Sequence, residues 1–334
     1  MRPKVFVTRK ITQEALGIIA QECDVEVFPE ERPITKEELR TAVKDKDGIL
    51  VLVTDEVDGE VIEAGNKLKI IANYGEGYNH VNITVASERG IWVTNTPSPD
   101  IATAVAEATI GLILTVSKRI VEADKFMRTG KFKGWGPTDW IGQELAHKML
   151  GIIGMGRIGR EVAERMRGWN MNICYYDKAG RMDWGEEKRF GAIYVYLETV
   201  LRESDFISIH VPLNRTTHHL IGEKELSLMK PTAFLINTSR GGVIDERALV
   251  KALKEKKIAG AALDVLEFEP KITRGLKKMK NVVITPHLAG ATESARVKPA
   301  ILAARNLVAG VMGKPPLNPV NLIDIKTDIK NSSD

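Results

Sequence analysis

Short apolar runs alternate with amphipathic segments along most of the chain, and this alternation predicts its architecture. The apolar runs are typical of buried strands, and the segments between them carry apolar residues at helical spacing. Strand–helix alternation with short connections predicts parallel sheets that helices cover on both faces. In the first third of the chain we expect strands at residues 4–8, 24–28, 48–53, 68–74 and 91–94, with helices at 12–21, 35–44, 59–65 and 83–87.

A stiff stretch with two prolines, residues 95–100, ends this first pattern and predicts a crossing into a second domain. One long helix is expected after it, at about residues 102–130, ending at a glycine. The loop-like stretch that follows, residues 131–144, carries Trp135 and Trp140. Exposed tryptophans indicate a partner surface, which we favour, or else a small satellite core beneath the loop.

The second half of the chain repeats the alternation and ends in a further helix. Strands are expected at residues 150–153, 172–176, 192–195, 205–211, 233–237, 260–265 and 282–285, with helices at 160–167, 196–203, 222–228 and 246–256. The last helix is expected at about residues 292–312, bent or frayed at Pro299, and the polar tail after residue 325 should be disordered. The whole pattern predicts an α/β protein with two doubly wound parallel-sheet domains.

Length and composition fit a soluble two-domain protein and exclude several classes of function. The chain has 334 residues, of which 43% are hydrophobic and 28% charged. The net charge of +4 is not concentrated anywhere, so we expect no nucleic-acid partner. Cys23 and Cys174 are expected to be buried free thiols, as in a reducing compartment. No apolar run approaches the ~20 residues of a membrane span, and the opening strand leaves no room for a signal peptide, so we expect a cytoplasmic protein with no membrane partner.

A glycine-rich turn, Gly154-x-Gly156-x-x-Gly159, is the most informative motif of the chain. It follows the apolar run at residues 149–153 and opens a helical segment. Gly154 permits a tight turn, Gly156 lets a pyrophosphate approach the backbone, and Gly159 lets helix and strand pack closely. Free N–H groups at the start of the helix would then hold the phosphates of a dinucleotide.

An acidic residue stands at the end of the next predicted strand. Asp177 follows residues 172–176, where a carboxylate can accept both ribose hydroxyls of the adenosine. No arginine follows it directly, as a 2′-phosphate would require, although Lys178 and Arg181 are near. A simple strand-end role is the alternative, but with the glycine turn the pattern favours NAD(H) as cofactor, with NADP(H) as the second choice.

A second glycine-containing turn, Gly75-Glu76-Gly77, follows the fourth predicted strand. The carboxyl ends of parallel strands are where open α/β sheets bind ligands. The two glycines allow backbone conformations in which consecutive N–H groups converge on an anion. The spacing fits an ordinary glycine turn equally well.

Three loops after strands of the second sheet carry reactive groups. Arg240 follows one strand, Asp264 and several glutamates follow the next, and His287 follows the last. A guanidinium can hold a carboxylate bidentately, and a histidine beside a glutamate can exchange a proton near neutral pH. Each has an ordinary structural explanation, but beside a nicotinamide they are the groups that transfer of hydride to a 2-keto acid needs. No metal site is expected.

Six motifs follow one another along the chain: the glycine turn, His210-Val211-Pro212-Leu213, Leu228-Met229-Lys230-Pro231, the stretch from Asn237 to Asp245, Ala262-Leu263-Asp264-Val265 with Glu269-Pro270, and Thr285-Pro286-His287. In these motifs the chain resembles the D-isomer-specific 2-hydroxyacid dehydrogenases, over about residues 3–322, and within that family it looks most like the glyoxylate/hydroxypyruvate reductases. The resemblance implies an NAD(P)H-dependent enzyme that reduces glyoxylate or hydroxypyruvate. It also implies a homodimer formed through the segment after the interdomain crossing.

The resemblance assigns roles to matched residues. Arg240 would bind the substrate carboxylate and keto oxygen, His287 would be the proton donor, and Glu269 would orient His287 and raise its pKa. Backbone N–H groups of the loop Gly75, Glu76 and Gly77 would complete the carboxylate site. The cofactor contacts would come from Gly154, Gly156, Arg157, Ile158, Gly159, Asp177, Pro212, Thr217 and Asp264, the last at the nicotinamide amide.

The resemblance also implies the domain organisation. Residues 1–98 and 290–325 would form a flavodoxin-like substrate-binding domain, residues 99–289 a Rossmann NAD-binding domain with the dimerisation segment, and residues 326–334 a disordered tail. Three other dehydrogenases share this scaffold, acting on 3-phosphoglycerate, D-lactate or phosphite. A further alternative from another class is an NADH-sensing transcriptional corepressor.

Overall fold

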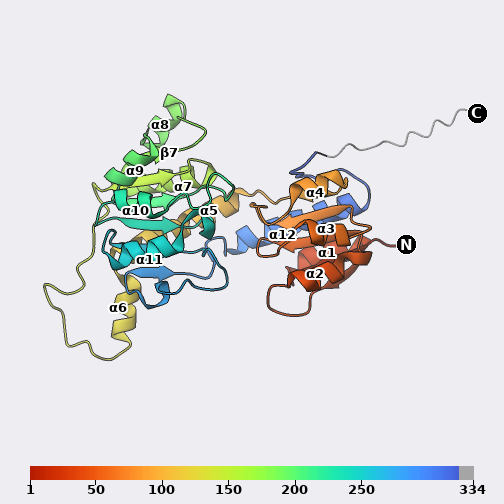
Figure 1. Ribbon diagram of the computed structural model, residues 1–334, viewed down its shortest axis with the longest axis horizontal. Helices are drawn as coiled ribbons and strands as arrows, with labels where there is room; N and C mark the ends of the chain where they lie inside the picture. Colours follow the sequence, from red (N-terminus) through yellow and green to blue (C-terminus); the bar gives the residue numbers. More distant parts are fainter. Residues whose placement is uncertain (323–334) are drawn as a thin grey trace, which may run out of the picture. The chain divides into compact units, whose positions relative to one another are not determined.

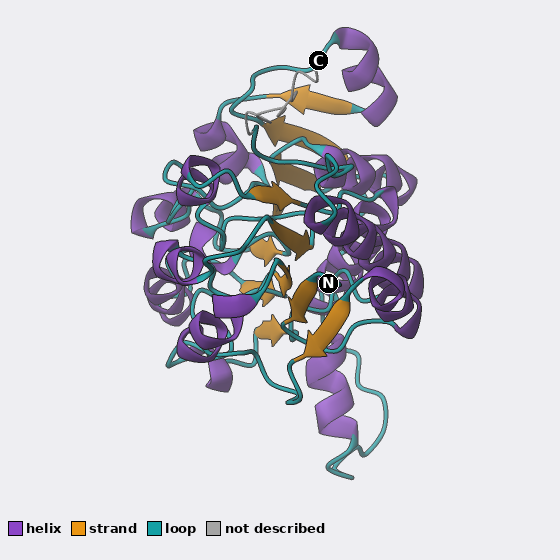
Figure 2. Ribbon diagram, turned by 90° about the vertical axis from the view of Figure 1, so that its right-hand side faces the viewer, coloured by secondary structure: helices purple, strands orange, loops and turns teal. Residues whose placement is uncertain are grey.

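The computed structural model describes residues 1–322 and divides into two compact units. The first unit combines Met1–Pro99 with the chain from Glu293 onward, and the second is the continuous segment Asp100–Thr292. In both units strands form a central layer between helices (Figure 2). The predicted disordered tail lies outside the described residues, and the separate roles of the two domains stay predictions.

The first unit is a five-stranded parallel sheet with the strand order β2-β1-β3-β4-β5. This order belongs to the flavodoxin-like class of doubly wound sheets, as the family resemblance implied. Its strands are β1 (Lys4–Val7), β2 (Asp24–Val27), β3 (Gly48–Leu52), β4 (Ile70–Tyr74) and β5 (Trp92–Thr94), and its helices are α1 (Gln13–Glu22), α2 (Lys36–Ala42), α3 (Gly59–Ala64), α4 (Ile83–Glu88) and α12 (Glu293–Val311).

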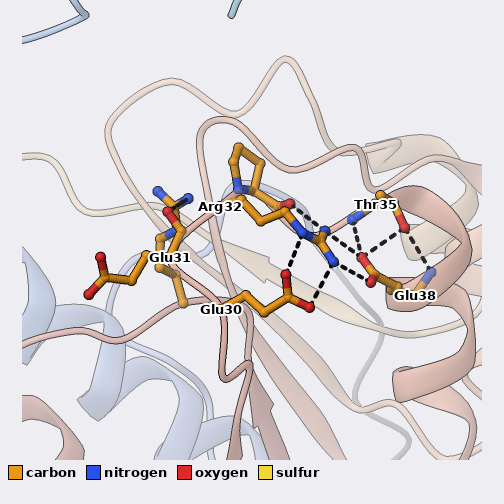
Figure 3. A network of polar contacts seen from close by, with 7 residues as sticks. Glu30, Glu31, Arg32, Thr35 and Glu38 are labelled. Atoms are coloured by element: carbon orange, nitrogen blue, oxygen red, sulfur yellow. Dashed lines mark hydrogen bonds and ion pairs between the residues drawn. The ribbon is translucent and has the colours of Figure 1, made fainter.

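The start of α2 is fixed by reciprocal side-chain bonds (Figure 3). The Glu38 amide donates to the Thr35 hydroxyl at 3.3 Å, and the Glu38 carboxylate accepts from the Thr35 amide at 2.8 Å. Arg32 bridges Glu38 and Glu30, at 2.6 and 2.7 Å. These bonds, with Arg32 first among them, lower the pKa of Glu38 to about 2. The capping box explains why the predicted helix begins where it does.

Helix α12 completes the core of the first unit although it comes far later in the chain (Figure 1). It packs against α1 and against the strands β3 and β4. Ala303 and Leu307 are fully buried there, and a Cβ on Gly48 would lie 2.6 Å from Val311. The helix continues through Pro299, so the fraying considered at that residue does not interrupt it.

The second unit is a seven-stranded parallel sheet with the order β12-β11-β10-β9-β6-β7-β8. From β6 the chain adds β7 and β8 on one side of the sheet and then returns to add β9, β10, β11 and β12 on the other side. This is the Rossmann arrangement with one further strand, β12. The strands are β6 (Met149–Ile153), β7 (Asn172–Tyr176), β8 (Ala192–Tyr194), β9 (Phe206–Ile209), β10 (Phe234–Asn237), β11 (Gly260–Leu263) and β12 (Val282–Ile284). The helices are α5 (Pro99–Ser117), α6 (Ile120–Met127), α7 (Arg157–Met166), α8 (Trp184–Phe190), α9 (Leu197–Glu203), α10 (Glu223–Leu228) and α11 (Glu246–Lys254). The first residue of α5, Pro99, is the last residue of the N-terminal segment of the first unit.

The single long helix predicted at residues 102–130 is wrong, because the chain forms α5 and α6 instead. Between them Arg119 takes a left-handed conformation with φ 57°, which no α-helix continues. The Ser117 carbonyl at the end of α5 accepts instead from the Gln143 amide at 2.8 Å. The loop at residues 131–144 therefore terminates the helix, an interaction that a local pattern cannot reveal.

Helix α5 is long and apolar enough to cross a membrane by length and composition, with a mean hydropathy of 1.5. The sequence pattern did not reveal this, because the predicted helix was longer and more polar. Half of that window is buried inside the protein, where Leu112 and Ile113 pack against the second unit's sheet. This burial is typical of a core helix.

Candidate active site

The three glycines of the turn after β6 differ in what surrounds them. Gly154 has φ 98°, and a Cβ there would lie 2.6 Å from the His210 carbonyl oxygen. A Cβ on Gly159 would lie 2.2 Å from the Gly154 oxygen, whereas a Cβ on Gly156 would meet no heavy atom of the described residues within 4 Å beyond its own neighbours in the chain. The turn thus has a tight bend, a close packing contact and one open approach, as predicted for a pyrophosphate-binding loop.

Asp177 lies at the end of β7, beside this turn. Its carboxylate accepts from the Met155 amide at 2.7 Å and from the Ala179 amide at 2.8 Å. Arg157 and Ile158 are the first two residues of α7, whose N-cap Gly156 supplies no side-chain bond in the described structure. The start of a helix is where backbone N–H groups can bind a phosphate, and Gly156 leaves the approach to this one open. These residues fit a dinucleotide, which the protein would hold by its phosphates and adenosine ribose.

Pro212 and Thr217 meet in the loop after β9. The Thr217 hydroxyl donates to the Pro212 carbonyl at 2.6 Å and accepts from the Asn214 amide at 2.8 Å. Thr217 is buried and Pro212 is exposed. Thr217 thus fixes the loop that presents Pro212, and its predicted place in the cofactor cleft stays a prediction.

Arg240 lies in a loop after β10 that two contacts brace. The Asn237 side chain donates to the Arg240 carbonyl at 2.9 Å and accepts from the Ser239 amide at 3.0 Å. A Cβ on Gly241 would lie 1.9 Å from the Leu266 backbone, so this loop sits directly on the loop after β11. Only glycine permits that approach, which brings Arg240 near Glu269.

Glu269 and His287 form a hydrogen-bonded pair. The distance from Glu269 Oε2 to His287 Nδ1 is 3.1 Å, and both side chains are about one-third exposed (30% and 33%). The other Glu269 oxygen accepts from the Leu266 amide at 2.9 Å. Burial raises the pKa of Glu269, but the bonds from His287 and Leu266, with the positive charge of Arg240, lower it on balance. Glu269 is therefore a carboxylate that accepts from Nδ1 and leaves Nε2 of His287 for other partners.

Asp264 fixes the backbone on both sides of His287, a structural role that the sequence pattern did not reveal. Its side chain is 1% exposed and accepts from the Leu288 amide at 2.9 Å and the Ala289 amide at 2.8 Å. The Thr285 hydroxyl donates to it at 2.6 Å. Its backbone carbonyl accepts from the His287 amide at 2.8 Å, and His287 has φ 53°. The predicted contact of Asp264 with a nicotinamide amide stays a prediction.

Two adjacent histidines lie near the same loop. The ligand atoms of His218, His219 and Glu267 all lie within 4.8 Å of one another. The two imidazole rings stack, however, with centroids 3.9 Å apart and planes inclined by 27°. Nearly parallel rings cannot direct their in-plane lone pairs at one ion, so the 2.8 Å contact between His219 and Glu267 fits a hydrogen bond better than a metal site.

In the first unit, the loop with Gly75, Glu76 and Gly77 is held by its carbonyl groups. The Asn73 side chain donates to the carbonyls of Gly75 and Gly77, both at 3.0 Å, and the Asn95 side chain donates to that of Glu76 at 2.9 Å. Fixing three successive carbonyls orients the peptide planes of the loop. Asn73 and Asn95 are braces that the glycine spacing did not reveal, and the binding of an anion by this loop stays a prediction.

Comparisons with known proteins agree over nearly the whole chain. Residues 110–289 match the family described as D-isomer specific 2-hydroxyacid dehydrogenase, NAD binding domain. The glyoxylate reductase of Thermococcus litoralis is 48% identical over 325 residues, which are 96% of this chain and 97% of that protein. The glyoxylate reductase of Pyrococcus furiosus is 45% identical over 331 residues, 98% of this chain and 97% of that protein.

Solved structures also match nearly the whole length of the chain. The crystal structure of a glyoxylate reductase from Paecilomyes thermophila has a TM-score of 0.83 at 30% identity, covering 96% of this chain and 98% of that one. The NADPH-dependent glyoxylate/hydroxypyruvate reductase of Sinorhizobium meliloti, in complex with NADP and malonate, also gives 0.83 and 30%, covering 96% and 97%. The fold and the order of its parts are therefore common to this chain and to these proteins.

Proposed function

Because the chain belongs to the D-isomer-specific 2-hydroxyacid dehydrogenases, and is therefore an NAD-dependent oxidoreductase, we propose that it reduces glyoxylate or hydroxypyruvate. The product would be glycolate or the D-2-hydroxy acid. The names of the relatives support this substrate class, since those quoted above are glyoxylate reductases or a glyoxylate/hydroxypyruvate reductase. The other dehydrogenases of this scaffold and the corepressor are the alternatives.

The observation that carries the proposal is the hydrogen-bonded pair of Glu269 and His287, in the loops after β11 and β12, with Arg240 in the loop after β10. When bound, the reduced nicotinamide would supply a hydride to the keto carbon. Arg240 would hold the substrate carboxylate bidentately and polarise the keto group. His287 would donate the proton from Nε2 to the keto oxygen, while Glu269 stabilises the imidazolium through Nδ1.

Substitution of Arg240 tests this assignment. We expect Arg240→Ala to lower kcat/KM for glyoxylate by roughly 10²–10⁴, the value of two charge-assisted hydrogen bonds. NADH binding, followed by fluorescence titration, should not change, and the exposed Arg247→Ala is the matched control. Retained turnover in Arg240→Ala would refute the assignment.

A substrate panel separates the alternatives. Oxidation of NADH and NADPH is followed with glyoxylate, hydroxypyruvate, pyruvate, phenylpyruvate and 2-ketogluconate. Preference for the first two supports the proposal, and preference for pyruvate supports a lactate dehydrogenase. Tight NADH binding without turnover of any of them would favour the corepressor-like alternative.

We further propose a cytoplasmic homodimer formed through α6 and the loop that follows it. Apolar side chains gather on this segment, with Trp135 85% and Ile141 68% exposed. Trp140 differs, since its ring packs against Phe126 at 5.1 Å and against the Arg119 guanidinium, as in a satellite cluster.

Two buried free thiols, Cys23 and Cys174, support the cytoplasmic location, because free thiols are typical of a reducing compartment. Fractionation of the source cells tests it.

A further inference from the structure

A cleft of about 300 Å³ opens at the end of β7, where the proposed function puts the adenosine ribose of the cofactor. Three carboxylates line it, those of Asp177, Asp183 and Glu186, together with the guanidinium groups of Arg160 and Arg181. An arginine in this place can bind the 2′-phosphate of NADP(H), which carries about two negative charges. The choice between NADH and NADPH therefore depends in part on whether these two arginines can reach a 2′-phosphate.

Neither Arg160 nor the nearby Lys178 is without a partner. Arg160 pairs with Glu186 across the cleft wall at 2.9 Å. Lys178 donates to the Thr216 hydroxyl at 3.3 Å. Arg181 is the remaining cation, and its side chain is 59% exposed, so sterically it could reach a ligand.

Arg181 instead binds the carboxylate of Glu187, a residue of α8. Arg181 Nε lies 3.0 Å from both carboxylate oxygens, and its Nη2 lies 2.7 Å from Oε2. Glu187 is 5% exposed and accepts further bonds from the Tyr175 hydroxyl at 3.1 Å and the Tyr194 amide at 3.2 Å. Moving Arg181 to a phosphate would leave a buried carboxylate without its counter-charge, which is strongly unfavourable.

The same network fixes the chain between the strand and the helix. The Tyr175 hydroxyl, which donates to Glu187, accepts from the Met182 amide at 2.7 Å. Gly180, with φ 100°, forms the turn after Asp177. The two neighbours of Arg181 in the chain are thus bonded through their amides, to Asp177 and Tyr175, and its side chain is bonded to Glu187.

We propose that Glu187 is a positioning residue for cofactor specificity: by binding Arg181 it withholds that guanidinium from a 2′-phosphate and makes the cleft select NADH. Asp177 contributes its own negative charge to the same preference. The inference rests on the proposed function for the location of the cofactor. It assigns the selectivity to a side chain that would never touch the cofactor itself.

The test compares two probes, AMP and adenosine 2′,5′-bisphosphate, by calorimetry on the full chain. The variants are Glu187→Gln, which keeps the shape and the bonds from Tyr175 and Tyr194, and the double variant with Arg181→Met. Glu187→Gln should raise the affinity for the bisphosphate relative to AMP by about tenfold or more, the value of one charge-assisted hydrogen bond. The double variant should lose this gain, because the released guanidinium is then missing.

Two outcomes would overturn the proposal: equal changes for both probes in Glu187→Gln, or a gain that persists in the double variant. If Glu187→Gln does not fold, the double variant, which buries no unpaired charge, is compared with the wild type instead. A ratio of bisphosphate affinity to AMP affinity that is more than about threefold lower in the double variant would mean that Arg181 already binds the phosphate in the wild type, which would overturn the proposal. Glyoxylate reduction with NADH is measured in the same preparations, so a wrong substrate is distinguished from a wrong account of specificity.

Discussion

His210, at the carboxyl end of β9, is a histidine held neutral inside the fold. Its Nε2 lies 2.8 Å from the Ser208 hydroxyl, and its Nδ1 is buried. Burial lowers the pKa of His210 to about 3, because a charged ring would lose its hydration there. An unfolded chain would take up a proton near pH 6.5 at this position.

This difference makes the free energy of unfolding depend on pH. The folded pKa lies below the unfolded one, so between pH 6.5 and 3 the unfolded chain binds the extra proton and stability falls as pH falls. Between pH 7 and 5 we expect His210 to remove about 2 kcal/mol, which His210→Asn should restore. Urea unfolding of both proteins across this range measures it, and parallel curves would contradict the expectation.

At the scale of residues, the sequence predicts the groups that stand directly after strands, such as Arg240, His287 and Asp177. Their positions follow from the rule that carboxyl ends of parallel strands meet at one edge. The residues that hold them were not predictable, because Asp264, Asn237 and Glu187 act through backbone amides or partners that only the folded chain brings near. Asp264 was noticed as a candidate ligand contact, and its bonds to the His287 loop came only from the structure.

At the scale of elements, the turn between β6 and α7 offers a matched pair of substitutions. Gly159→Ala would push a Cβ to 2.2 Å from the Gly154 oxygen, and we expect it to destabilise the protein by about 1–3 kcal/mol. Gly156→Ala has an ordinary φ of −74° and open space, so the fold should be unchanged. Its methyl group would occupy the phosphate approach and weaken NADH binding by about tenfold.

Denaturant unfolding and NADH titration distinguish these two effects. Gly156→Ala should lose affinity at unchanged stability, and Gly159→Ala should lose stability first. If Gly156→Ala binds NADH normally, the pyrophosphate does not approach the turn at that residue.

Elements with a strong apolar periodicity were predicted. The errors lie where tertiary contacts determine whether an element forms or where it ends. Helix α8 was missed because seven largely polar residues carry little pattern, and its stability rests on the Asp183 cap and on the buried Glu187 and Phe190. The break between α5 and α6 was missed because a distant loop supplies the terminating hydrogen bond. Strand β9 ends at Ile209, two residues earlier than predicted, although the His210 amide still donates to the Ile153 carbonyl at 2.7 Å.

At the scale of the whole molecule, the proposed homodimer can be tested at the exposed segment around Trp135. We expect light scattering to give twice the monomer mass for the wild type. Trp135→Glu should shift the protein to the monomer, because a charge in an apolar interface is not solvated. Tyr196→Glu, at an aromatic residue 76% exposed elsewhere in the second unit, should leave the dimer intact. A Trp135→Glu protein that stays dimeric would place the interface elsewhere.

The return of α12 to the first unit also sets an order of events during translation. The strands β3 and β4 emerge from the ribosome early, but the helix that covers them at Ala303 and Leu307 is made only after the whole of Asp100–Thr292. The second unit, by contrast, is one uninterrupted segment and can complete its sheet as soon as it has emerged. The unit that is synthesised first is therefore finished last, and its apolar face must be kept from other nascent chains in the meantime.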